Sequence, residues 1–159
     1  MMTSLSCKVI AALEGRTLAT AESCTGGGIG YALTAVPGSS AVYKGGIIAY
    51  TNEVKVSQLG VSTELLDREG AVSGSVAAMM AVGARTHLNA DIAISVTGLA
   101  GPGGDEYGNE VGTVYIGYSS DLVTNVKKFV FSGDRITVRK QAIDAALNLV
   151  LEYENEREL

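Results

Sequence analysis

Apolar positions along this chain change their spacing repeatedly, and the changes divide it into alternating strands and helices. Short strand-like runs span 17–21, 45–50 and 91–96. The run 91–96 is continuously apolar, which predicts a strand inside the sheet that is covered on both faces. Apolar residues at helical spacing predict longer helices over 4–13, 25–35 and 75–88, with a final long helix from Asp134 onward. Shorter helices are predicted after Thr51-Asn52 and over 63–69.

The last two strand-like segments have a different arrangement from the earlier ones. They span 113–118 and 123–131 and are joined by the short turn Ser119-Ser120-Asp121, as in an antiparallel hairpin. The earlier strands alternate with helices, which favours parallel pairing. We therefore predict an α/β fold: a three-layer α/β/α single domain over 1–159, with a mixed sheet of about five strands.

Composition narrows the class of protein. The 159 residues are 47% hydrophobic, enough for one core, and the formal net charge of −5 argues against a nucleic-acid partner. Two cysteines make no disulfide framework, and a single histidine without a carboxylate cluster argues against a metal site. With no secretion signal and no run of about 18 apolar residues, we expect a cytoplasmic domain without membrane contact, metal or other cofactor.

The segment Ala21-Glu22-Ser23-Cys24-Thr25-Gly26-Gly27-Gly28 carries the clearest chemistry, because it lies between a predicted strand and a predicted helix. A nucleophile on such a turn is held rigidly, and amides at the helix start can bind negative charge. Ser23 is the candidate nucleophile, although it can equally cap a helix. Cys24 is the alternative nucleophile, but without an imidazole nearby it is expected to pack as a small hydrophobic residue.

A serine nucleophile needs a base, and the chain offers a lysine rather than a histidine. His87, the single histidine, sits late in a predicted helix and is expected to be a helix-end residue. Among six lysines, Lys55 stands apart because it falls in the first turn of a helix that follows a strand. The helix dipole there opposes a cation and lowers a lysine pKa. If the first two strands are neighbours, Ser23 and Lys55 share one edge of the sheet; the alternative is a solvated surface lysine.

Two further segments are candidate ligand-binding elements. Arg135 and Arg139 lie four residues apart at the start of the last helix, where they form an anion clamp or simply pair with Asp134 and solvent. The glycine-rich stretch 97–104 follows the third strand and exposes backbone amides, but it matches no nucleotide-binding fingerprint.

Three segments together resemble the CinA C-terminal domain family, whose stand-alone members are nicotinamide-nucleotide amidohydrolases. These segments are 20–27, 36–55 and 96–104, with support from 70–73 and 111–115, so that the resemblance covers roughly Val9 to Ala146. It implies a three-layer α/β/α fold and hydrolysis of the carboxamide of nicotinamide mononucleotide to nicotinate mononucleotide and ammonia. The longer relatives' N-terminal domain has no counterpart here, so its activity is not expected.

The resemblance also implies roles for individual residues. Ser23 matches the nucleophile and Lys55 its partner, while Tyr50 and Thr97 match residues of the same pocket; Arg135 and Arg139 match basic residues near the ligand. On this interpretation the catalytic residues are Ser23, Lys55 and Tyr50. The substrate-binding residues are Cys24, Thr25, Gly26, Thr97, Gly98, Gly101, Gly103, Arg135 and Arg139, with the turn 24–26 as the oxyanion hole.

One segment departs from the family pattern. Family members often carry Lys-Pro before the Val-Gly-Thr-Val segment, where this chain has Asn109-Glu110 after Asp105-Glu106-Tyr107. This acidic loop is expected to affect ligand affinity or loop conformation. The expected partner is a small nucleotide substrate, with a second copy of the chain in a homodimer. The alternatives are a non-catalytic pyridine-nucleotide or phosphate-binding module, a structural domain and, more distantly, a metal-dependent amidase.

Overall fold

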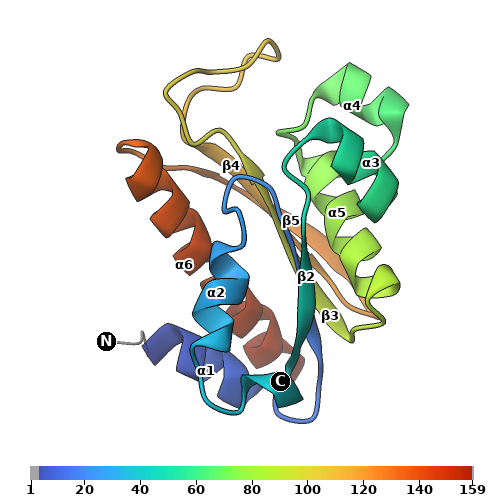
Figure 1. Ribbon diagram of the computed structural model, residues 1–159, viewed down its shortest axis with the longest axis vertical. Helices are drawn as coiled ribbons and strands as arrows, with labels where there is room; N and C mark the ends of the chain where they lie inside the picture. Colours follow the sequence, from blue (N-terminus) through green and yellow to red (C-terminus); the bar gives the residue numbers. More distant parts are fainter. Residues whose placement is uncertain (1–3, 159) are drawn as a thin grey trace.

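The computed structural model describes residues 4–158, which form a five-stranded mixed sheet with the order β2-β1-β3-β4-β5. The strands are β1 (Leu18–Glu22), β2 (Tyr43–Ile48), β3 (Ile92–Gly98), β4 (Thr113–Ser119) and β5 (Thr124–Val130). Strand β1 pairs in parallel with β2 and β3, whereas β3–β4 and β4–β5 are antiparallel. The carboxyl ends of β1, β2 and β3 therefore meet at one edge of the sheet (Figure 1).

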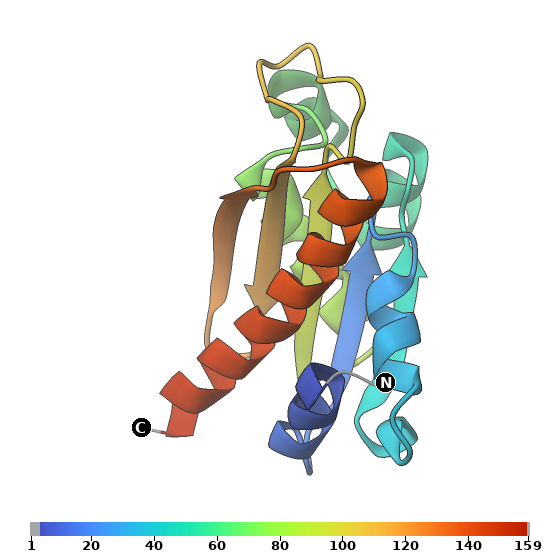
Figure 2. The same cartoon turned by 90° about the vertical axis from the view of Figure 1, so that its left-hand side faces the viewer.

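Helices cover both faces of the sheet, and the predicted three-layer α/β/α arrangement is confirmed (Figures 1 and 2). One face carries α1 (Ser4–Ala12), α2 (Gly28–Thr34) and α6 (Arg135–Glu158). The other carries α3 (Asn52–Leu59), α4 (Thr63–Glu69) and α5 (Gly74–His87). A short 3-10 turn, η1 (Ser39–Ala41), precedes β2.

Strand β3 shows why its sequence is continuously apolar. Ile92, Ile94 and Val96 pack in the core between the sheet and α1, α2 and α6, whereas Ala93 packs in the core toward α5. Successive side chains of a strand point to opposite faces, and both faces of β3 are covered. Each fully buried isoleucine contributes about 1.5–3 kcal/mol of transfer free energy. The small residue Ala93 and the hydroxyl of Ser95, which donates to the Ala77 carbonyl at 2.6 Å, let α5 approach closely.

Two of the shifts between predicted and observed element boundaries bear on the loops beside the site. The helix predicted over 25–35 begins only at Gly28, because Gly26 and Gly27 adopt positive φ angles of 59° and 98° that end any helical path through them. The strand predicted over 45–50 lies at Tyr43–Ile48, so that Tyr50 falls in the loop beyond it. Both shifts enlarge the loops at the edge of the sheet where β1 and β2 end.

A buried ion pair closes the opposite end of the sheet. Arg16 Nη1 donates to both carboxylate oxygens of Glu154 at 2.8 Å, and the two side chains are 16% and 5% exposed. The Tyr118 hydroxyl donates to the same carboxylate at 3.1 Å, and burial, with the Glu154 charge, raises the pKa of Tyr118 to about 12. This network attaches the end of α6 to the segment before β1 and to β4.

Candidate active site

Ser23 and Lys55 are brought together by the parallel pairing of β1 and β2. Glu22 at the end of β1 lies opposite Ile48 at the end of β2, so the residues that follow each strand are neighbours. The Ser23 amide donates to the Val96 carbonyl at 2.9 Å, which attaches the turn to β3 as well. This register meets the condition on which the sequence placed Ser23 and Lys55 together, namely that the first two strands are neighbours.

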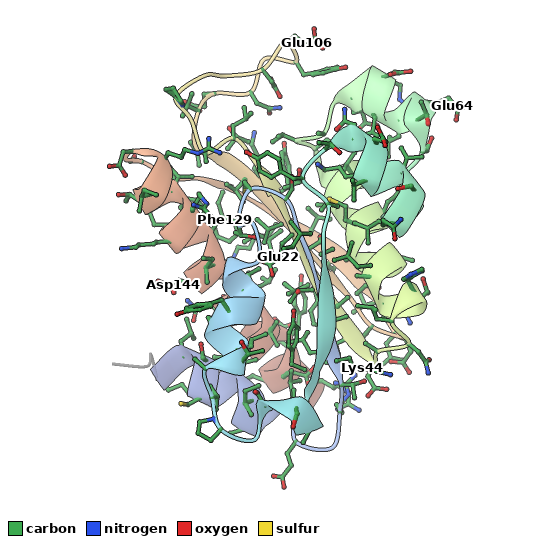
Figure 3. The ribbon with its side chains drawn as sticks, in the orientation of Figure 1. Glu22, Lys44, Glu64, Glu106, Phe129 and Asp144 are labelled. Atoms are coloured by element: carbon green, nitrogen blue, oxygen red, sulfur yellow. The ribbon has the colours of Figure 1, made fainter. Side chains whose placement is uncertain are left out.

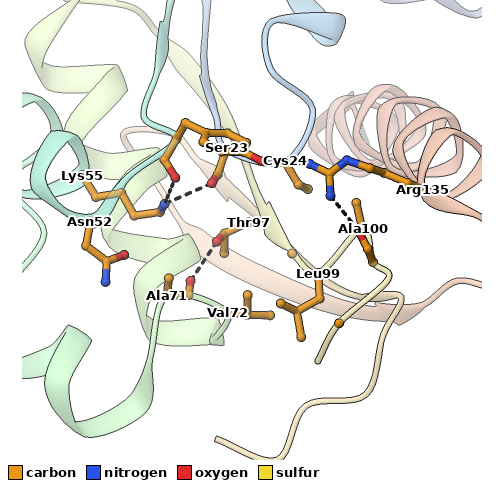
Figure 4. A pocket seen from close by; sticks show the side chains of 14 residues that line it. Ser23, Cys24, Asn52, Lys55, Ala71, Val72, Thr97, Leu99, Ala100 and Arg135 are labelled. Atoms are coloured by element: carbon orange, nitrogen blue, oxygen red, sulfur yellow. Dashed lines mark hydrogen bonds between the residues drawn. The ribbon is translucent and has the colours of Figure 1, made fainter. Parts of the chain in front are cut away.

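The amine of Lys55 lies against the Ser23 hydroxyl inside the protein. Lys55 Nζ is 3.0 Å from Ser23 Oγ (Figure 4). It is also 3.0 Å from the Ala49 carbonyl oxygen and 3.4 Å from that of Tyr50. Lys55 is 1% exposed and Ser23 is 7% exposed. Among residues 4–158 no carboxylate forms an ion pair with Lys55. The lysine is therefore buried with neutral partners, an arrangement that disfavours its charged form.

Burial lowers the pKa of Lys55 to about 8. The sequence predicted a lowered pKa from the position of Lys55 at a helix start, but the main cause is desolvation of the ammonium. A neutral amine keeps two N–H donors and one lone pair. With the donors directed to the carbonyls of Ala49 and Tyr50, the lone pair is left for the Ser23 hydroxyl proton. This geometry suits a general base.

The neighbouring thiol is unsuited to nucleophilic attack. Cys24 is buried, and burial raises its pKa to about 11 despite the nearby Arg139 and Lys55 charges. The thiolate is the nucleophilic form of cysteine, and at neutral pH this thiol remains protonated. The structure therefore favours the hydroxyl of Ser23 over the thiol of Cys24.

A pocket of about 270 Å³ opens beside the two side chains. Most of the residues assigned to the site from the sequence line it, namely Ser23, Cys24, Tyr50, Lys55, Thr97, Gly98, Gly101, Gly103 and Arg135. Five further lining residues were not assigned to the site individually: Leu99 and Ala100 lie in the glycine-rich stretch 97–104, whereas Asn52, Ala71 and Val72 come from other segments. Ala71 and Val72 follow α4 and reach the pocket because the Thr97 hydroxyl donates to the Ala71 carbonyl at 2.8 Å (Figure 4).

Asn52 is the polar side chain that the sequence interpretation missed. The sequence indicated only that Thr51-Asn52 caps a helix. In the structure the N-cap of α3 is Thr51, whose hydroxyl accepts from the Val54 amide. The Asn52 carboxamide lines the pocket near Lys55 (Figure 4). Its spacing of three residues before Lys55 places both on one side of α3, which is the signal that could have identified it.

Three residues expected to bind substrate do not line the pocket. Thr25 is completely buried, and its hydroxyl donates to Glu22 Oε1 at 2.7 Å. Gly26 lies outside the pocket. Arg139 donates from Nε to the Cys24 carbonyl at 3.0 Å and from Nη2 to the Thr25 carbonyl at 3.3 Å. The structure does not bring the two arginines together as a clamp: Arg135 lines the pocket, whereas Arg139 contacts the backbone of the nucleophile turn.

The start of α2 is occupied by a side chain of the protein itself. Glu22 is 2% exposed, and its carboxylate accepts from the amides of Ile29 and Gly30 at 2.9 and 3.1 Å. Figure 3 shows Glu22 between α2 and the sheet. Because these amides are the donors that a helix start offers to an anion, a substrate phosphate is not expected to bind there.

Arg135 lies at the mouth of the pocket. Its Nη1 donates to the Gly101 carbonyl at 2.6 Å and its Nη2 to the Tyr50 hydroxyl at 2.8 Å. The alternative that it pairs with Asp134 is not what the structure shows, since the Asp134 carboxylate accepts from the Thr137 amide at 2.9 Å. Arg135 thus connects the loop after β2 with the loop after β3 and keeps its charge beside the cavity.

The acidic loop folds on itself and stays out of this pocket. The Asp105 carboxylate accepts from the amides of Tyr107 and Asn109 at 3.0 Å each and from the Asn109 carboxamide at 2.8 Å. Asn109 also donates to the Val72 carbonyl at 3.0 Å, and Glu106 lies at the exposed tip (Figure 3). The loop therefore supports the wall of the pocket through Val72.

His87 lies away from the pocket, and the described residues contain neither a metal-binding cluster nor a membrane-spanning helix. His87 is exposed and ends α5, whose 14 residues span about 20 Å from its start near the pocket. Among residues 4–158, no three His, Cys, Asp or Glu side chains gather in a way that can hold a metal ion. In the same range, no helix combines the length and the hydropathy needed to cross a membrane.

Comparisons with known proteins agree on one family. The model of the CinA C-terminal domain matches residues 2–153. A CinA-like protein of Thermosynechococcus vestitus is 54% identical over 123 residues, or 76% of this chain and 29% of that protein. A putative competence-damage inducible protein of Halothermothrix orenii is 49% identical over 141 residues, 88% of this chain and 34% of its own length. The chain thus spans about a third of these relatives.

Solved structures share the whole fold. A CinA superfamily protein from Klebsiella pneumoniae superimposes with a TM-score of 0.94 at 35% identity, covering 96% of this chain and 97% of the other. A competence/damage inducible protein, CihA, from Agrobacterium tumefaciens gives a TM-score of 0.91 at 38% identity, covering 96% and 94%. The likeness therefore extends over all three layers.

Proposed function

This chain belongs to the CinA C-terminal domain family, and on that basis we propose that it hydrolyses the carboxamide of nicotinamide mononucleotide, with Ser23 as nucleophile and Lys55 as base. The observation that carries the proposal is the 3.0 Å contact between Lys55 Nζ and Ser23 Oγ, made by a lysine that burial holds at a pKa of about 8. A purely binding module gains nothing from a buried amine with a lowered pKa.

The first half of the reaction transfers the acyl group to the enzyme. Neutral Lys55 takes the hydroxyl proton of Ser23 as Oγ bonds to the carboxamide carbon. The C–N bond of the tetrahedral intermediate then breaks, and the Lys55 ammonium gives its proton to the departing nitrogen, which leaves as ammonia. In the second half, water gives a proton to Lys55 and attacks the ester, and Ser23 recovers its proton on leaving. Nicotinate mononucleotide is the second product.

The oxyanion of the intermediate needs an N–H donor in the turn after Ser23. The Gly26 amide already donates to the Ser23 carbonyl at 3.1 Å, and Thr25 is completely buried. Cys24 follows the nucleophile directly and lines the pocket. Of the three amides expected to form the oxyanion hole, that of Cys24 is therefore the one we assign to it, as in other strand-to-helix nucleophile turns.

The rest of the pocket accommodates the remainder of the nucleotide. Its volume of about 270 Å³ lies just below the range of about 300 to 1,000 Å³ that is typical of ligand sites. Such a space suits the ring and ribose, leaving the phosphate at the mouth beside the Arg135 guanidinium. Tyr50, bound to Arg135 through its hydroxyl, borders the same opening.

Release of ammonia from nicotinamide mononucleotide by the purified chain tests the proposal. We expect turnover by the wild type and a loss of about 10⁴-fold or more in Ser23→Ala, with nucleotide binding retained in a thermal-shift assay. Wild-type activity in Ser23→Ala would exclude the serine as nucleophile. Binding without ammonia release by the wild type would instead support a pyridine-nucleotide or phosphate-binding module.

A further inference from the structure

Arg139 contacts the nucleophile turn through main-chain carbonyls. Its Nε and Nη2 donate to the carbonyls of Cys24 and Thr25, and the guanidinium is a planar group with its donors in a fixed arrangement. A Cβ atom at Gly26 would lie 3.3 Å from Nη2, so the missing side chain there leaves room for this approach. Arg139 does not line the pocket, whereas Ser23 and Cys24 do. The guanidinium therefore reaches the turn from the side away from the cavity.

All three consecutive carbonyls of the turn have partners. The Ser23 carbonyl accepts from the Gly26 amide, the Cys24 carbonyl from Arg139, and the Thr25 carbonyl from both the Gly28 amide and Arg139. A peptide unit cannot rotate without breaking the bond that its carbonyl makes. Arg139 is the partner that comes from outside the turn, and it holds the unit directly after Cys24. The Cys24 N–H belongs to the preceding peptide unit, whose Ser23 carbonyl accepts from the Gly26 amide. Because the two units meet at the Cα of Cys24, Arg139 limits the movement of the Cys24 amide by fixing the unit that follows it.

Glu22 also holds this turn, from the side of α2. Glu22 receives the Thr25 hydroxyl and two α2 amides, so the turn is fixed from the helix side as well. Between Arg139 and Glu22 lies the residue whose amide is assigned to the oxyanion. Preorganised donors of this kind are a large source of rate enhancement because they need no reorientation during the reaction.

We propose that Arg139 is a positioning residue that holds the Ser23 hydroxyl and the Cys24 amide in register, and that it is not a ligand of the substrate phosphate. The inference rests on the proposed role of Ser23 as nucleophile. It separates two arginines on one helix: Arg139 acts on the rate of the chemical step, and Arg135 acts on substrate affinity.

Steady-state kinetics of three variants test the role of Arg139. Arg139→Met is expected to lower kcat about 10- to 100-fold, since misplacement of reacting groups by about 1 Å has effects of that size, with KM within about threefold of the wild type. Arg139→Lys, which restores one donor, is expected to recover part of kcat. Lys140→Met removes a charge from the next position of α6 and serves as the matched control with unchanged constants. A raised KM with unchanged kcat in Arg139→Met would overturn the proposal.

A probe that needs no nucleotide separates this inference from the choice of substrate. A fluorophosphonate reacts when Ser23 Oγ bonds to phosphorus, fluoride leaves and Lys55 accepts the hydroxyl proton; the phosphoryl oxygen then takes the place of the oxyanion. We expect Arg139→Met to slow this labelling about 10- to 100-fold while Lys140→Met labels at the wild-type rate. Equal labelling of all variants would contradict the inference even if ammonia release is confirmed. Slow labelling confined to Arg139→Met would support it even if another amide proves to be the substrate.

Discussion

The two ends of the sheet bury cationic side chains in opposite ways. At one end Arg16 forms an ion pair with Glu154, in which Arg16 Nη1 lies 2.8 Å from each carboxylate oxygen. At the other end Lys55 is buried against a hydroxyl and two carbonyls and has no carboxylate partner in the part of the chain that the structure describes. The ion pair attaches the end of α6 to the segment before β1. A buried amine without a counter-charge has a lowered pKa and is available for proton transfer.

This comparison predicts that the largest loss of activity follows from replacing Lys55, the buried cation without a carboxylate partner. Lys55→Met removes the proposed base while filling a similar volume, and we expect ammonia release to fall by about 10³-fold or more. Arg16→Met, the matching change at the paired end, is expected to leave kcat of the folded fraction within about twofold, because it lies at the far end of the sheet. Ammonia assays on both variants check this contrast, and comparable losses in the two would remove the distinction.

The largest loss of stability is expected when the ion pair between Arg16 and Glu154 is broken. Glu154→Ala leaves the Arg16 guanidinium and the Tyr118 hydroxyl without their acceptor, and breaking a buried pair typically costs about 3–5 kcal/mol. The expected result is a reduced free energy of unfolding in urea titrations with the slope unchanged. Glu156→Ala, an exposed carboxylate two residues along α6, is the control and should change stability by less than about 0.5 kcal/mol.

Stability should change in the other direction when Lys55 is replaced. Its pKa falls from 10.5 to about 8 in the folded chain, which corresponds to about 3 kcal/mol of disfavoured charge at neutral pH, at about 1.4 kcal/mol per unit. After allowance for the lost hydrogen bonds, Lys55→Met is expected to gain about 1–2 kcal/mol in unfolding free energy at pH 7. A marked loss of stability would show that the amine is stabilising and therefore effectively paired.

The sign of the pH dependence gives a smaller and more specific test. Because the folded-state pKa of Lys55 lies below the unfolded value, the unfolded chain binds more protons between pH 8 and pH 10.5. The Lys55 contribution to stability is therefore unfavourable below about pH 8 and disappears as pH rises through this window. The stability advantage of Lys55→Met over the wild type should shrink from pH 7 to pH 10. An advantage that is constant with pH would contradict the lowered pKa.

The sequence was sufficient for the parts of the site that follow directly from strand ends. Ser23 and Lys55 each come after a strand, and once β1 and β2 are parallel neighbours, their proximity is a consequence of the fold. The sequence could not separate Arg135 from Arg139, since both lie on one face of a helix. Their contacts differ because Arg139 lies against the nucleophile turn and Arg135 against the loop after β3.

The sequence also could not predict contacts that depend on the local direction of the backbone. Glu22 precedes the nucleophile and looks like a strand-end carboxylate, yet the positive φ angles at Gly26 and Gly27 turn the start of α2 back onto it. The sequence indicates only a helix cap at Asn52, and its place in the pocket follows from the position of α3 in the fold. Tertiary arrangement, which the hydrophobic pattern does not encode, decided both.

The pH dependence of kcat/KM for ammonia release from nicotinamide mononucleotide tests the central claim most directly. If neutral Lys55 is the base, kcat/KM should rise about tenfold per pH unit below the lysine pKa and level off above about pH 8. The Lys55→Met variant should lose this rise together with its activity. A wild-type profile that is flat or falling between pH 6 and pH 9 would contradict a neutral lysine as the general base.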